Sequence, residues 1–391
     1  MINTIKLKRL GQVCSGITTD TSENNFTLYG STGKIGYCTK ANYNGEYILV
    51  ARVGANAGYV YKIRDKCGIT DNTLVFSKNK NVNLDYLTYY LKQYDFKKIL
   101  SGSGRPLITG TDLLNIDIFY PKNEEQEQIA KYLDTKTTKI EQTITKNKKL
   151  IELLKEKRTA LINQAVTKGL NPYTQMKESG IDWIKKIPEH WTVKTFKNVN
   201  IFNPTVNINS LNEDSDITYT PMENIKQGLF INQSAKLKDI PNNLTRYEEG
   251  DIVLAKVTPC FENGNLAIMN NLYSGFGFGS SELFVIRVKT IYKKFLFYWL
   301  QSETFIQKAC STMHGVAGLQ RIDSDFIKNS KIPLPNINEQ KQIADYLDNQ
   351  TKLIDKTIEK IEENIELFEE YKESLIHHVV TGKVDIRGVE V

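Results

Sequence analysis

Polar side chains in glycine-flanked loops are the candidate binding residues of this sequence. Hydroxyls, amides and cations in such loops can donate hydrogen bonds to phosphate oxygens and base edges, and glycine lets the backbone approach a duplex closely. Arg105 and Arg321 are the strongest candidates for DNA contact, and we expect them to be equivalent because each precedes the run that leads into a long helix. For single Ser, Thr or Asn residues, turn formation or helix capping explains the pattern equally well. The candidates are Ser31, Thr32, Lys34, Arg52, Asn56, Ser101, Ser103, Arg105, Lys256, Thr258, Asn263, Ser280, Ser281, His314, Gln320 and Arg321.

Four short motifs look like parts of enzyme sites but lack residues that such sites need. Residues 276–279 (FGFG) are similar to a glycine-rich S-adenosylmethionine loop, yet a strand-like run follows where a helix should begin. Residues 203–205 (NPT) lack the second proline and the aromatic residue of a methyltransferase motif, and residues 33–35 (GKI) lack the Ser or Thr of a phosphate-binding loop. His377 and His378 are neighbours on a helix, so they point in different directions. We expect no catalytic residue, no cofactor and no metal site.

Composition is typical of a globular protein, with 40% hydrophobic and 25% charged residues. The five scattered cysteines form no C-x-x-C pair, which fits a reducing cytoplasm and argues against structural zinc. No apolar run approaches the ~20 residues of a membrane span, and the polar start at residues 1–11 does not resemble a secretory signal. We therefore expect a cytoplasmic protein with no membrane partner.

Positive charge is concentrated in the first part of the chain. Residues 1–122 contain 16 basic and 9 acidic residues, whereas residues 335–391 contain 7 and 13. A basic lobe can contact phosphates, although an ordinary solvated surface explains the same charges nearly as well. Charge alone therefore does not decide for nucleic acid.

An internal repeat with an offset of 214 residues organises the chain. Residues 121–134 (PKNEEQEQIAKYLD) match residues 335–348 (PNINEQKQIADYLD), and the alignment continues without a gap to residues 166–167 and 380–381. A weaker similarity relates residues 7–10 to residues 193–196. The chain therefore consists of two repeats, each with a globular segment followed by a long helix.

Each helix of the repeat has an apolar seam that steps by three and four residues, which is the heptad pattern of a coiled coil. Asn147 interrupts the first seam where Ile361 lies in the second, and Arg158 and Lys372 break the seams near their far ends. Helices of about 40 residues with half of the seam exposed are not expected to be stable alone, so we predict that the two pair as an antiparallel coiled coil. The alternative is that each helix only braces its own globular segment. The seam comprises Leu133, Ile140, Ile144, Asn147, Ile151, Leu154, Leu161, Leu347, Ile354, Ile358, Ile361, Ile365, Phe368 and Leu375.

The predicted fold class is α+β, with two mixed α/β globular segments and two long helices. Asn123 and Asn338 are predicted N-caps of these helices, and Gly169 and Gly382 follow their C-termini. Short alternating runs predict strands at 45–53, 58–63, 72–76, 251–257 and 283–288, with helices around 84–100 and 293–309. The predicted boundaries are 1–120 for the first globular segment, 121–170 for its helix, 171–190 for a polar linker, 191–334 for the second globular segment, and 335–391 for the last helix and tail.

Several motifs in this order resemble specificity subunits of Type I restriction-modification enzymes. Residues 166–191 (VTKGLNP, then SGIDW and IPEHW) resemble the central conserved region of that family, and the repeated EQxxIAxYLD helix start and residues 380–387 (VTGKVDIR) resemble its repeats. The two globular segments resemble two types of its target recognition domain, through residues 29–37, 53–58 and 70–72 in the first and residues 250–264 and 277–282 in the second. The resemblance covers essentially the whole chain.

The resemblance implies a non-catalytic DNA-binding subunit. Residues 1–120 and 191–334 would be target recognition domains that each read one half of a bipartite double-stranded DNA site, with the helix pair as the spacer that sets the unread gap. Two methyltransferase subunits would dock on the chain and methylate adenines, and restriction subunits would be further partners.

Two other classes of protein remain open on the sequence alone. A self-contained restriction or methylation enzyme would bind S-adenosylmethionine without a partner. A coiled-coil scaffold whose lobes bind protein would show no strongly salt-dependent binding to one defined duplex. A specificity subunit that has lost its methyltransferase partner is a variant of the favoured hypothesis.

Overall fold

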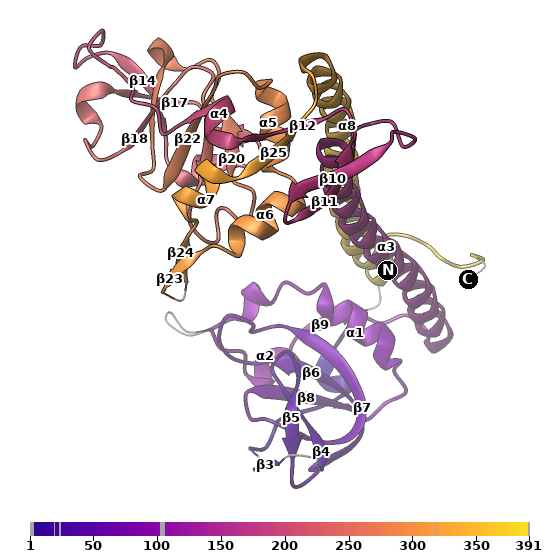
Figure 1. The fold of residues 1–391 in the computed structure, drawn as a ribbon. Helices are drawn as coiled ribbons and strands as arrows, with labels where there is room; N and C mark the ends of the chain where they lie inside the picture. The colour runs from indigo at the N-terminus through magenta and orange to yellow at the C-terminus, as the bar shows by residue number, and fades with distance from the viewer. Residues whose placement is uncertain (1–3, 19, 23–24, 102–105, 317, 390–391) are drawn as a thin grey trace. The chain divides into compact units, whose positions relative to one another are not determined.

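The computed structural model describes residues 4–18, 20–22, 25–101, 106–316 and 318–389 (Figure 1). The chain divides into two compact units, residues 1–149 with 361–391, and residues 150–360. Each unit contains one globular segment and a part of both long helices, α3 (Asn123–Lys168) and α8 (Ile337–Val380). Within the described ranges, every helix is too short or too polar to cross a membrane.

A seven-stranded sheet forms the centre of the first globular segment. Its elements are β1 (Thr4–Lys6), η1 (Leu7–Arg9), β2 (Gly11–Ser15), β3 (Thr21–Ser22), β4 (Phe26–Gly30), β5 (Gly33–Cys38), β6 (Tyr43–Ala51), β7 (Val60–Ile69), β8 (Thr73–Lys78), α1 (Leu84–Lys92), η2 (Phe96–Ile99), α2 (Gly110–Leu114) and β9 (Asp117–Phe119). The strand order is β2-β8-β6-β7-β4-β5-β3, and only the β4–β7 pair is parallel. Because side chains alternate along β6, Ile48 and Val50 pack in the core that contains α1, while Leu49 packs in a second cluster on the other face.

Two four-stranded sheets form the second globular segment, with orders β13-β22-β19-β20 and β17-β14-β21-β18. Its elements are β12 (Thr192–Thr195), α4 (Phe196–Val199), β13 (Asn200–Phe202), β14 (Asp216–Thr220), η3 (Met222–Asn224), β15 (Ile225–Lys226), β16 (Leu229–Phe230), β17 (Gln233–Lys236), η4 (Leu237–Asp239), β18 (Thr245–Glu248), β19 (Ile252–Ala255), β20 (Leu266–Ile268), η5 (Tyr273–Gly275), β21 (Phe276–Gly279), β22 (Leu283–Val288), α5 (Lys293–Leu300), α6 (Glu303–Cys310), β23 (His314–Val316), β24 (Leu319–Arg321), α7 (Ser324–Asn329) and β25 (Lys331–Leu334). Fully buried Phe295, Trp299 and Phe305 lie in its main core.

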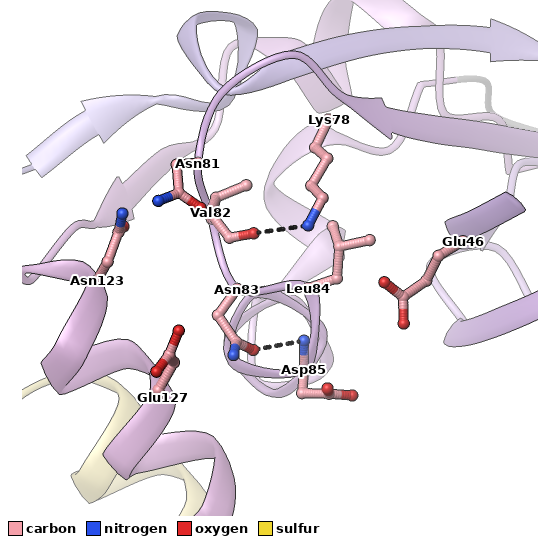
Figure 2. Close-up of a pocket in the computed structure, with 9 residues that line it drawn as sticks. All are labelled: Glu46, Lys78, Asn81, Val82, Asn83, Leu84, Asp85, Asn123 and Glu127. Atoms are coloured by element: carbon pink, nitrogen blue, oxygen red, sulfur yellow. Dashed lines mark hydrogen bonds between the residues drawn. The ribbon is translucent and has the colours of Figure 1, made fainter.

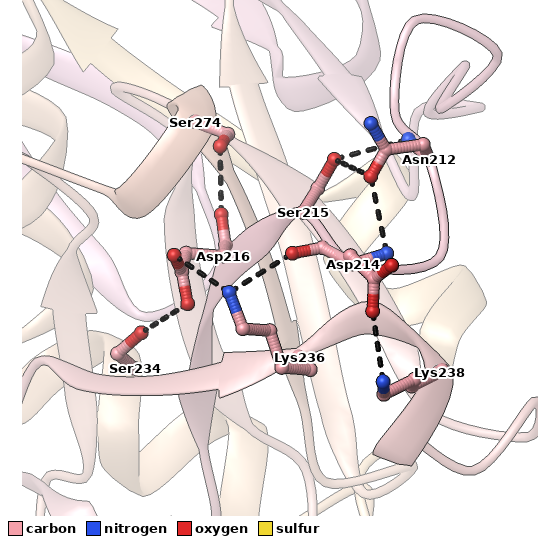
Figure 3. A network of polar contacts seen from close by, with 8 residues as sticks. All are labelled: Asn212, Asp214, Ser215, Asp216, Ser234, Lys236, Lys238 and Ser274. Atoms are coloured by element: carbon pink, nitrogen blue, oxygen red, sulfur yellow. Dashed lines mark hydrogen bonds and ion pairs between the residues drawn. The ribbon is translucent and has the colours of Figure 1, made fainter.

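Polar side chains stabilise the pairing of β14 with β17 at the edge of the second of these sheets (Figure 3). The Lys236 Nζ atom lies 3.0 Å from an Asp216 carboxylate oxygen, and Lys238 lies 2.8 Å from Asp214. The Ser274 hydroxyl donates to the Asp216 carbonyl at 2.7 Å and so fixes the neighbouring η5 turn to β14. These ion pairs are exposed to solvent, so their contribution to stability is small.

The two globular segments share one arrangement of strands, which we call the frame, even though their sequences differ. Strands β2, β8, β6 and β7 occur in the same order and with the same antiparallel pairing as β13, β22, β19 and β20. A second shared feature is the terminal strand pair, β1 with β9 and β12 with β25. Mixed α/β segments that flank two long helices were predicted, and this fold class is confirmed.

The weak similarity between residues 7–10 and 193–196 is wrong by three positions. The Leu7 amide donates to the Ile116 carbonyl at 2.9 Å, and the Phe196 amide donates in the same way to Ser330 at 2.8 Å. Since Ile116 and Ser330 are related by the repeat offset of 214, Leu7 corresponds to Phe196. Both segments have a buried apolar residue at this turn, but the residue type differs. Matching by residue type therefore aligned the wrong positions.

Helices α3 and α8 run antiparallel, as the sequence predicted. In the first unit, Glu141 pairs with Lys372 at 3.4 Å and Lys148 pairs with Glu369 at 3.8 Å, so the partner's number falls as the residue number rises. In the second unit, Arg158 pairs with Asp355 at 3.2 Å. This pair and Glu141–Lys372 are related by the repeat offset of 214. Arg158 and Lys372, which break the seams near their far ends, are therefore paired across the two helices, where they favour one register.

Most of the seam residues are buried. Asn147, Leu154, Leu161, Phe368 and Leu375 are half-buried instead. The buried seam residues are Leu133, Ile140, Ile144, Ile151, Leu347, Ile354, Ile358, Ile361 and Ile365. Burial of this stripe on both helices agrees with a paired role for the seam rather than with bracing by one helix alone.

A buried glutamine near the start of each long helix holds the short helix of the adjoining globular segment. The Gln340 side chain accepts from the Tyr292 amide at 2.8 Å and donates to the Pro335 carbonyl at 2.8 Å. Gln126 makes the equivalent bonds to the Asn83 amide at 3.0 Å and to the Pro121 carbonyl at 2.9 Å. The repeated sequence motif is thus a docking motif between helix and globular segment.

Figure 2 shows the pocket beside this junction in the first unit, where Asn83 caps α1 close to Asn123 and Glu127 of α3. The Asn83 Oδ1 atom accepts from the Asp85 amide at 2.9 Å. The Lys78 ammonium donates to the Val82 carbonyl at 3.4 Å. A capped helix start and a tethered loop therefore form the surface to which the beginning of α3 is attached.

A tyrosine–aspartate bond strengthens the same junction in both units. Tyr89 donates to Asp134 at 2.6 Å, and Tyr298 donates to Asp348 at 2.7 Å. Burial is the largest cause that raises the pKa of both phenols. Asp134 and Asp348 close the repeated EQxxIAxYLD motif, so both of its ends contact the globular segment.

The predicted N-caps of the long helices are wrong. Asn123 lies inside α3, and the Asn336 side chain, not that of Asn338, accepts from the amides of Asn338 and Glu339 at 3.1 and 3.0 Å. An asparagine two residues earlier can reach these amides from outside the helix. At the other ends, Gly169 and Gly382 have φ values of +75° and +72°, as expected for glycine after a helix.

Each predicted short helix is divided into two pieces. The segment 84–100 forms α1 and η2, because the Asp95 side chain caps the Lys97 amide at 3.3 Å and starts a new turn. The segment 293–309 forms α5 and α6, which separate at Ser302, whose hydroxyl donates to the Trp299 carbonyl at 2.7 Å. A short polar side chain bonds to the backbone at each break, and the apolar pattern of the sequence does not report such bonds.

The segment 171–190, expected to be a polar linker, contains a hairpin of β10 (Met176–Ile181) and β11 (Ile184–Pro188). Ile181, Ile184 and Ile187 are buried in the same cluster as Trp191 and the start of α8. Asp182, Lys185 and Lys186 lie between these isoleucines and hid the apolar face, so polarity alone was a poor guide to this segment.

Candidate DNA-reading sites

Backbone hydrogen bonds bring five of the predicted residues of the first globular segment into one loop cluster: Ser31, Thr32, Arg52, Asn56 and Ser101. The Arg52 amide donates to the Asn72 carbonyl at 3.1 Å, and this carbonyl also accepts from the Ser31 hydroxyl at 3.3 Å. The Arg52 carbonyl accepts from the Ile108 amide at 2.8 Å. Loops that follow β4 and β6 and precede β8 and α2 thus meet; we call them the first loop cluster (residues 31–32, 52–58, 70–72, 101 and 106–108).

The side chains of this cluster are partly engaged by neighbours. Within the cluster, Arg52 Nη1 donates to the Ser15 hydroxyl at 2.8 Å. Lys34 lies outside the cluster, on β5, where its ammonium is 4.0 Å from the centre of the Tyr37 ring. Ser101 donates to the Leu107 carbonyl at 3.1 Å. Thr32 and Asn56 are exposed at the loop tips, whereas Ser103 and Arg105 lie outside the described residues.

The predicted residues of the second globular segment meet in the same way. The Lys256 amide donates to the Glu282 carbonyl at 3.0 Å, and the Lys256 carbonyl accepts from the Ile322 amide at 2.9 Å. Thr258 and Gln320 exchange two bonds, both at 3.0 Å. We call this the second loop cluster (residues 256–264, 280–282 and 314–316 with 318–322).

A carboxylate links the two cations of the second loop cluster. Arg321 binds Glu282 through two parallel hydrogen bonds, from Nε at 3.0 Å and from Nη2 at 2.6 Å. The Lys256 ammonium lies 3.8 Å from the same carboxylate and donates to the Ser281 carbonyl at 2.6 Å. The hydrogen bond from Arg321 is the main reason that the pKa of Glu282 lies below its usual range. This carboxylate therefore stays charged at neutral pH.

The other predicted residues lie around this centre. The Ser280 hydroxyl accepts from the Glu282 amide at 3.2 Å. His314 is exposed and pairs opposite Arg321 in the β23–β24 hairpin. Asn263 is exposed in the turn between β19 and β20. The structure thus assembles the candidates of this segment on one surface.

Three positions of the two clusters are structurally equivalent: 52 with 256, 72 with 282, and 107 with 321. The bridge between Val53 and Leu107 corresponds to the bridge between Val257 and Arg321. Residue 107 precedes Ile108 as Arg321 precedes Ile322, and both isoleucine amides bond to the equivalent carbonyls. The predicted equivalence of Arg105 with Arg321 is therefore wrong, because Leu107 occupies that place.

Sequence reasoning missed Glu282 in the second loop cluster and Arg246 near it. Glu282 was part of the motif at 277–282 but was not named as a site residue. Arg246 lies at a groove that Lys256 and Ser281 also line, and its guanidinium is 5.7 Å from the Phe278 ring. Nothing in the local pattern around Arg246 singles it out, because its place depends on how β18 pairs with β21.

Comparison with known proteins identifies the family. The model of the Type I restriction modification DNA specificity domain matches residues 7–153 and 188–367, one match in each half of the repeat. The chain belongs to this family.

Individual specificity subunits of the family agree. The MjaVIII specificity subunit of Methanocaldococcus jannaschii is 30% identical over 370 residues, which cover 88% of this chain and 81% of that protein. The EcoAI specificity subunit of Escherichia coli is 30% identical over 199 residues, which cover 50% of this chain and only 33% of that protein.

Two solved structures show the same fold at low sequence identity. The HsdS subunit from Thermoanaerobacter tengcongensis has a TM-score of 0.57 at 14% identity, with coverage of 98% of this chain and 97% of that one. A chain from a study of complex assembly and conformational transition of the type I R-M system has a TM-score of 0.71 at 13% identity, with 98% of both chains covered.

Proposed function

We propose that this specificity-domain protein is a non-catalytic subunit that binds a bipartite double-stranded DNA site and recruits methyltransferase subunits. The observation that carries the proposal is the duplicated frame, in which equivalent loops of the two globular segments present different side chains. Two domains that read different DNA sequences need the same backbone arrangement with different exposed side chains.

The two loop clusters differ enough to read different sequences. At equivalent positions the first has Arg52, Asn72 and Leu107, whereas the second has Lys256, Glu282 and Arg321. Apolar leucine can contact a thymine methyl group, while arginine donates to guanine. The target should therefore consist of two unlike half-sites.

The helix pair supports a spacer role. Helices α3 and α8 contain 46 and 44 residues, and paired charges favour a single register. A helix of this length extends about 65–70 Å. A fixed spacer would give an unread gap of constant length between the half-sites.

Equivalent exposed leucines on the long helices support two copies of one partner. Leu153 and Leu367 are related by the repeat offset, and 50% and 60% of their surfaces are exposed. Each of these leucines has a second exposed apolar residue within one helical turn, Leu150 beside Leu153 and Tyr371 beside Leu367, and an exposed apolar patch is typical of a contact surface. Two methyltransferase subunits in the cytoplasm are the proposed occupants, with restriction subunits as further partners.

Binding measurements separate this function from its rivals. The purified chain together with its methyltransferase subunit should bind one defined duplex with an affinity that falls steeply as salt rises, because phosphate contacts release counterions. The chain alone should not bind S-adenosylmethionine in calorimetry. S-adenosylmethionine binding by the chain alone would favour a self-contained enzyme, and the absence of salt-dependent duplex binding by the assembled complex would favour a protein scaffold.

A further inference from the structure

Among the residues that the structure describes, the ion pair between Arg321 and Glu282 leaves one edge of the guanidinium without a hydrogen-bond partner. Glu282 occupies Nε and one hydrogen of Nη2, the side-on arrangement. The end edge, formed by Nη1 and the second hydrogen of Nη2, keeps two parallel donors. Parallel donors of this kind match the O6 and N7 acceptors of guanine in the major groove.

We propose that Arg321 reads a guanine in the half-site of the second globular segment, with Glu282 as its positioning residue. This inference rests on the proposed DNA-reading function and adds the base and the residue that reads it. Glu282 fixes the direction of the guanidinium and leaves its end edge for the base.

The surroundings of the pair favour a reading role over a purely structural one. The Arg321 side chain is 45% exposed, whereas the Glu282 side chain is only 28% exposed, so the carboxylate lies deeper than the cation that it holds. The backbone of Arg321 is fixed by its bridge to Val257. An arginine that is held in advance loses less side-chain entropy when it binds a base.

Charge around the carboxylate is balanced before DNA arrives. Lys256 lies 3.8 Å from the Glu282 oxygen that also accepts from Arg321 Nε, so one anion is shared by two cations and the group is net positive. A net positive group can approach phosphates despite its carboxylate. The equivalent group in the first globular segment cannot act in this way, because Leu107 and Asn72 occupy the positions of Arg321 and Glu282.

The test is methylation mapping of variants expressed with the methyltransferase subunit in a host without adenine methylation. Arg321→Lys keeps the charge but removes the two-donor edge. Glu282→Gln keeps the size but can accept only one of the two hydrogen bonds. The matched controls are Arg387→Lys and Asp385→Asn, since Arg387 binds Asp385 through the same two atoms, at 2.8 and 2.6 Å, in the C-terminal tail.

We expect one G·C pair in the second half-site to lose discrimination by about 5- to 150-fold in Arg321→Lys, the range for one bidentate base contact. Glu282→Gln should relax the same base pair by a smaller factor. The first half-site, the gap and the thermal melting of the protein should stay unchanged, and both controls should methylate the wild-type motif.

Three results would overturn the inference. A wild-type second half-site without a G·C pair would exclude the guanine. An unchanged motif in Arg321→Lys would exclude the arginine as the reader. A change of base preference in Glu282→Gln but not in Arg321→Lys would mean that the carboxylate itself reads a base, such as the amino group of cytosine. Failure of the proposed function is distinct, because the wild-type protein would then give no two-part motif at all.

Discussion

The buried glutamine at the start of α8 gives a stability prediction that depends directly on the docking motif. Gln340 is almost fully buried, at 2% exposure, and its amide makes two bonds, to the Tyr292 amide and the Pro335 carbonyl. In Gln340→Leu the side-chain volume is nearly preserved while both partners lose their bonds. The variant therefore measures the polar contribution with little change in packing.

The magnitude follows from two buried polar groups left without partners. Each such group costs about 1–3 kcal/mol, so we expect a loss of about 2–6 kcal/mol. For a unit of this size, each kcal/mol lowers the midpoint of unfolding by about 2–4 °C. The transition of the second unit should therefore move down by about 4–24 °C.

Calorimetry of the full chain is the assay, with hydrogen exchange to locate the change. The control is Gln342→Leu, since Gln342 is exposed on the same helix two residues later, and exposed substitutions usually change stability by less than about 0.5 kcal/mol. Exchange should accelerate most at the Tyr292 amide. Equal melting of the two variants would refute the view that Gln340 joins the helix to the globular segment.

Three further predictions concern the spacer, the partner surface and the ion pair. Deletion of the facing heptads 141–147 and 366–372 shortens each helix by about 10 Å and keeps the seam in phase, so methylation mapping should show a gap shorter by about one to three base pairs between unchanged half-sites; an unchanged gap would contradict the spacer role. Replacement of Leu153 and Leu367 together by Glu should abolish co-purification of the methyltransferase subunit while circular dichroism stays the same; retained co-purification would place the partner elsewhere. Because the pKa of Glu282 is lowered by Arg321, the pair stabilises the fold above the ordinary carboxyl pKa of 4.5 and this stabilisation is lost as pH falls through the lower value, so NMR titration should give Glu282 a pKa below 4.5 that returns toward it in Arg321→Gln.

Periodicity and repetition predicted the long-range architecture well. The heptad seam and the offset of 214 residues predicted two paired helices, and the ion pairs of Arg158 and Lys372 explain why polar residues interrupt that seam. Such patterns can be interpreted from sequence because the position of a residue in the heptad determines which face of the helix it lies on.

The residue types of the candidate sites could be predicted from the sequence, but the positions of these residues relative to one another could not. The loops were found from glycine and polar residues, whereas the equivalence of Leu107 with Arg321 follows only from bridges between segments far apart in sequence. Glu282 was missed for a related reason, because its role depends on Arg321, 39 residues away. The buried face of the hairpin at 176–188 was likewise hidden by its lysines.

Methylation mapping of the unmodified protein tests the central claim most directly. The chain is expressed with its methyltransferase subunit in a host that lacks adenine methylation, and modified bases are read by single-molecule sequencing. The account predicts one motif with two unlike halves and an unread gap of constant length. Absence of new methylation, with both proteins folded and associated, would contradict the DNA-reading role.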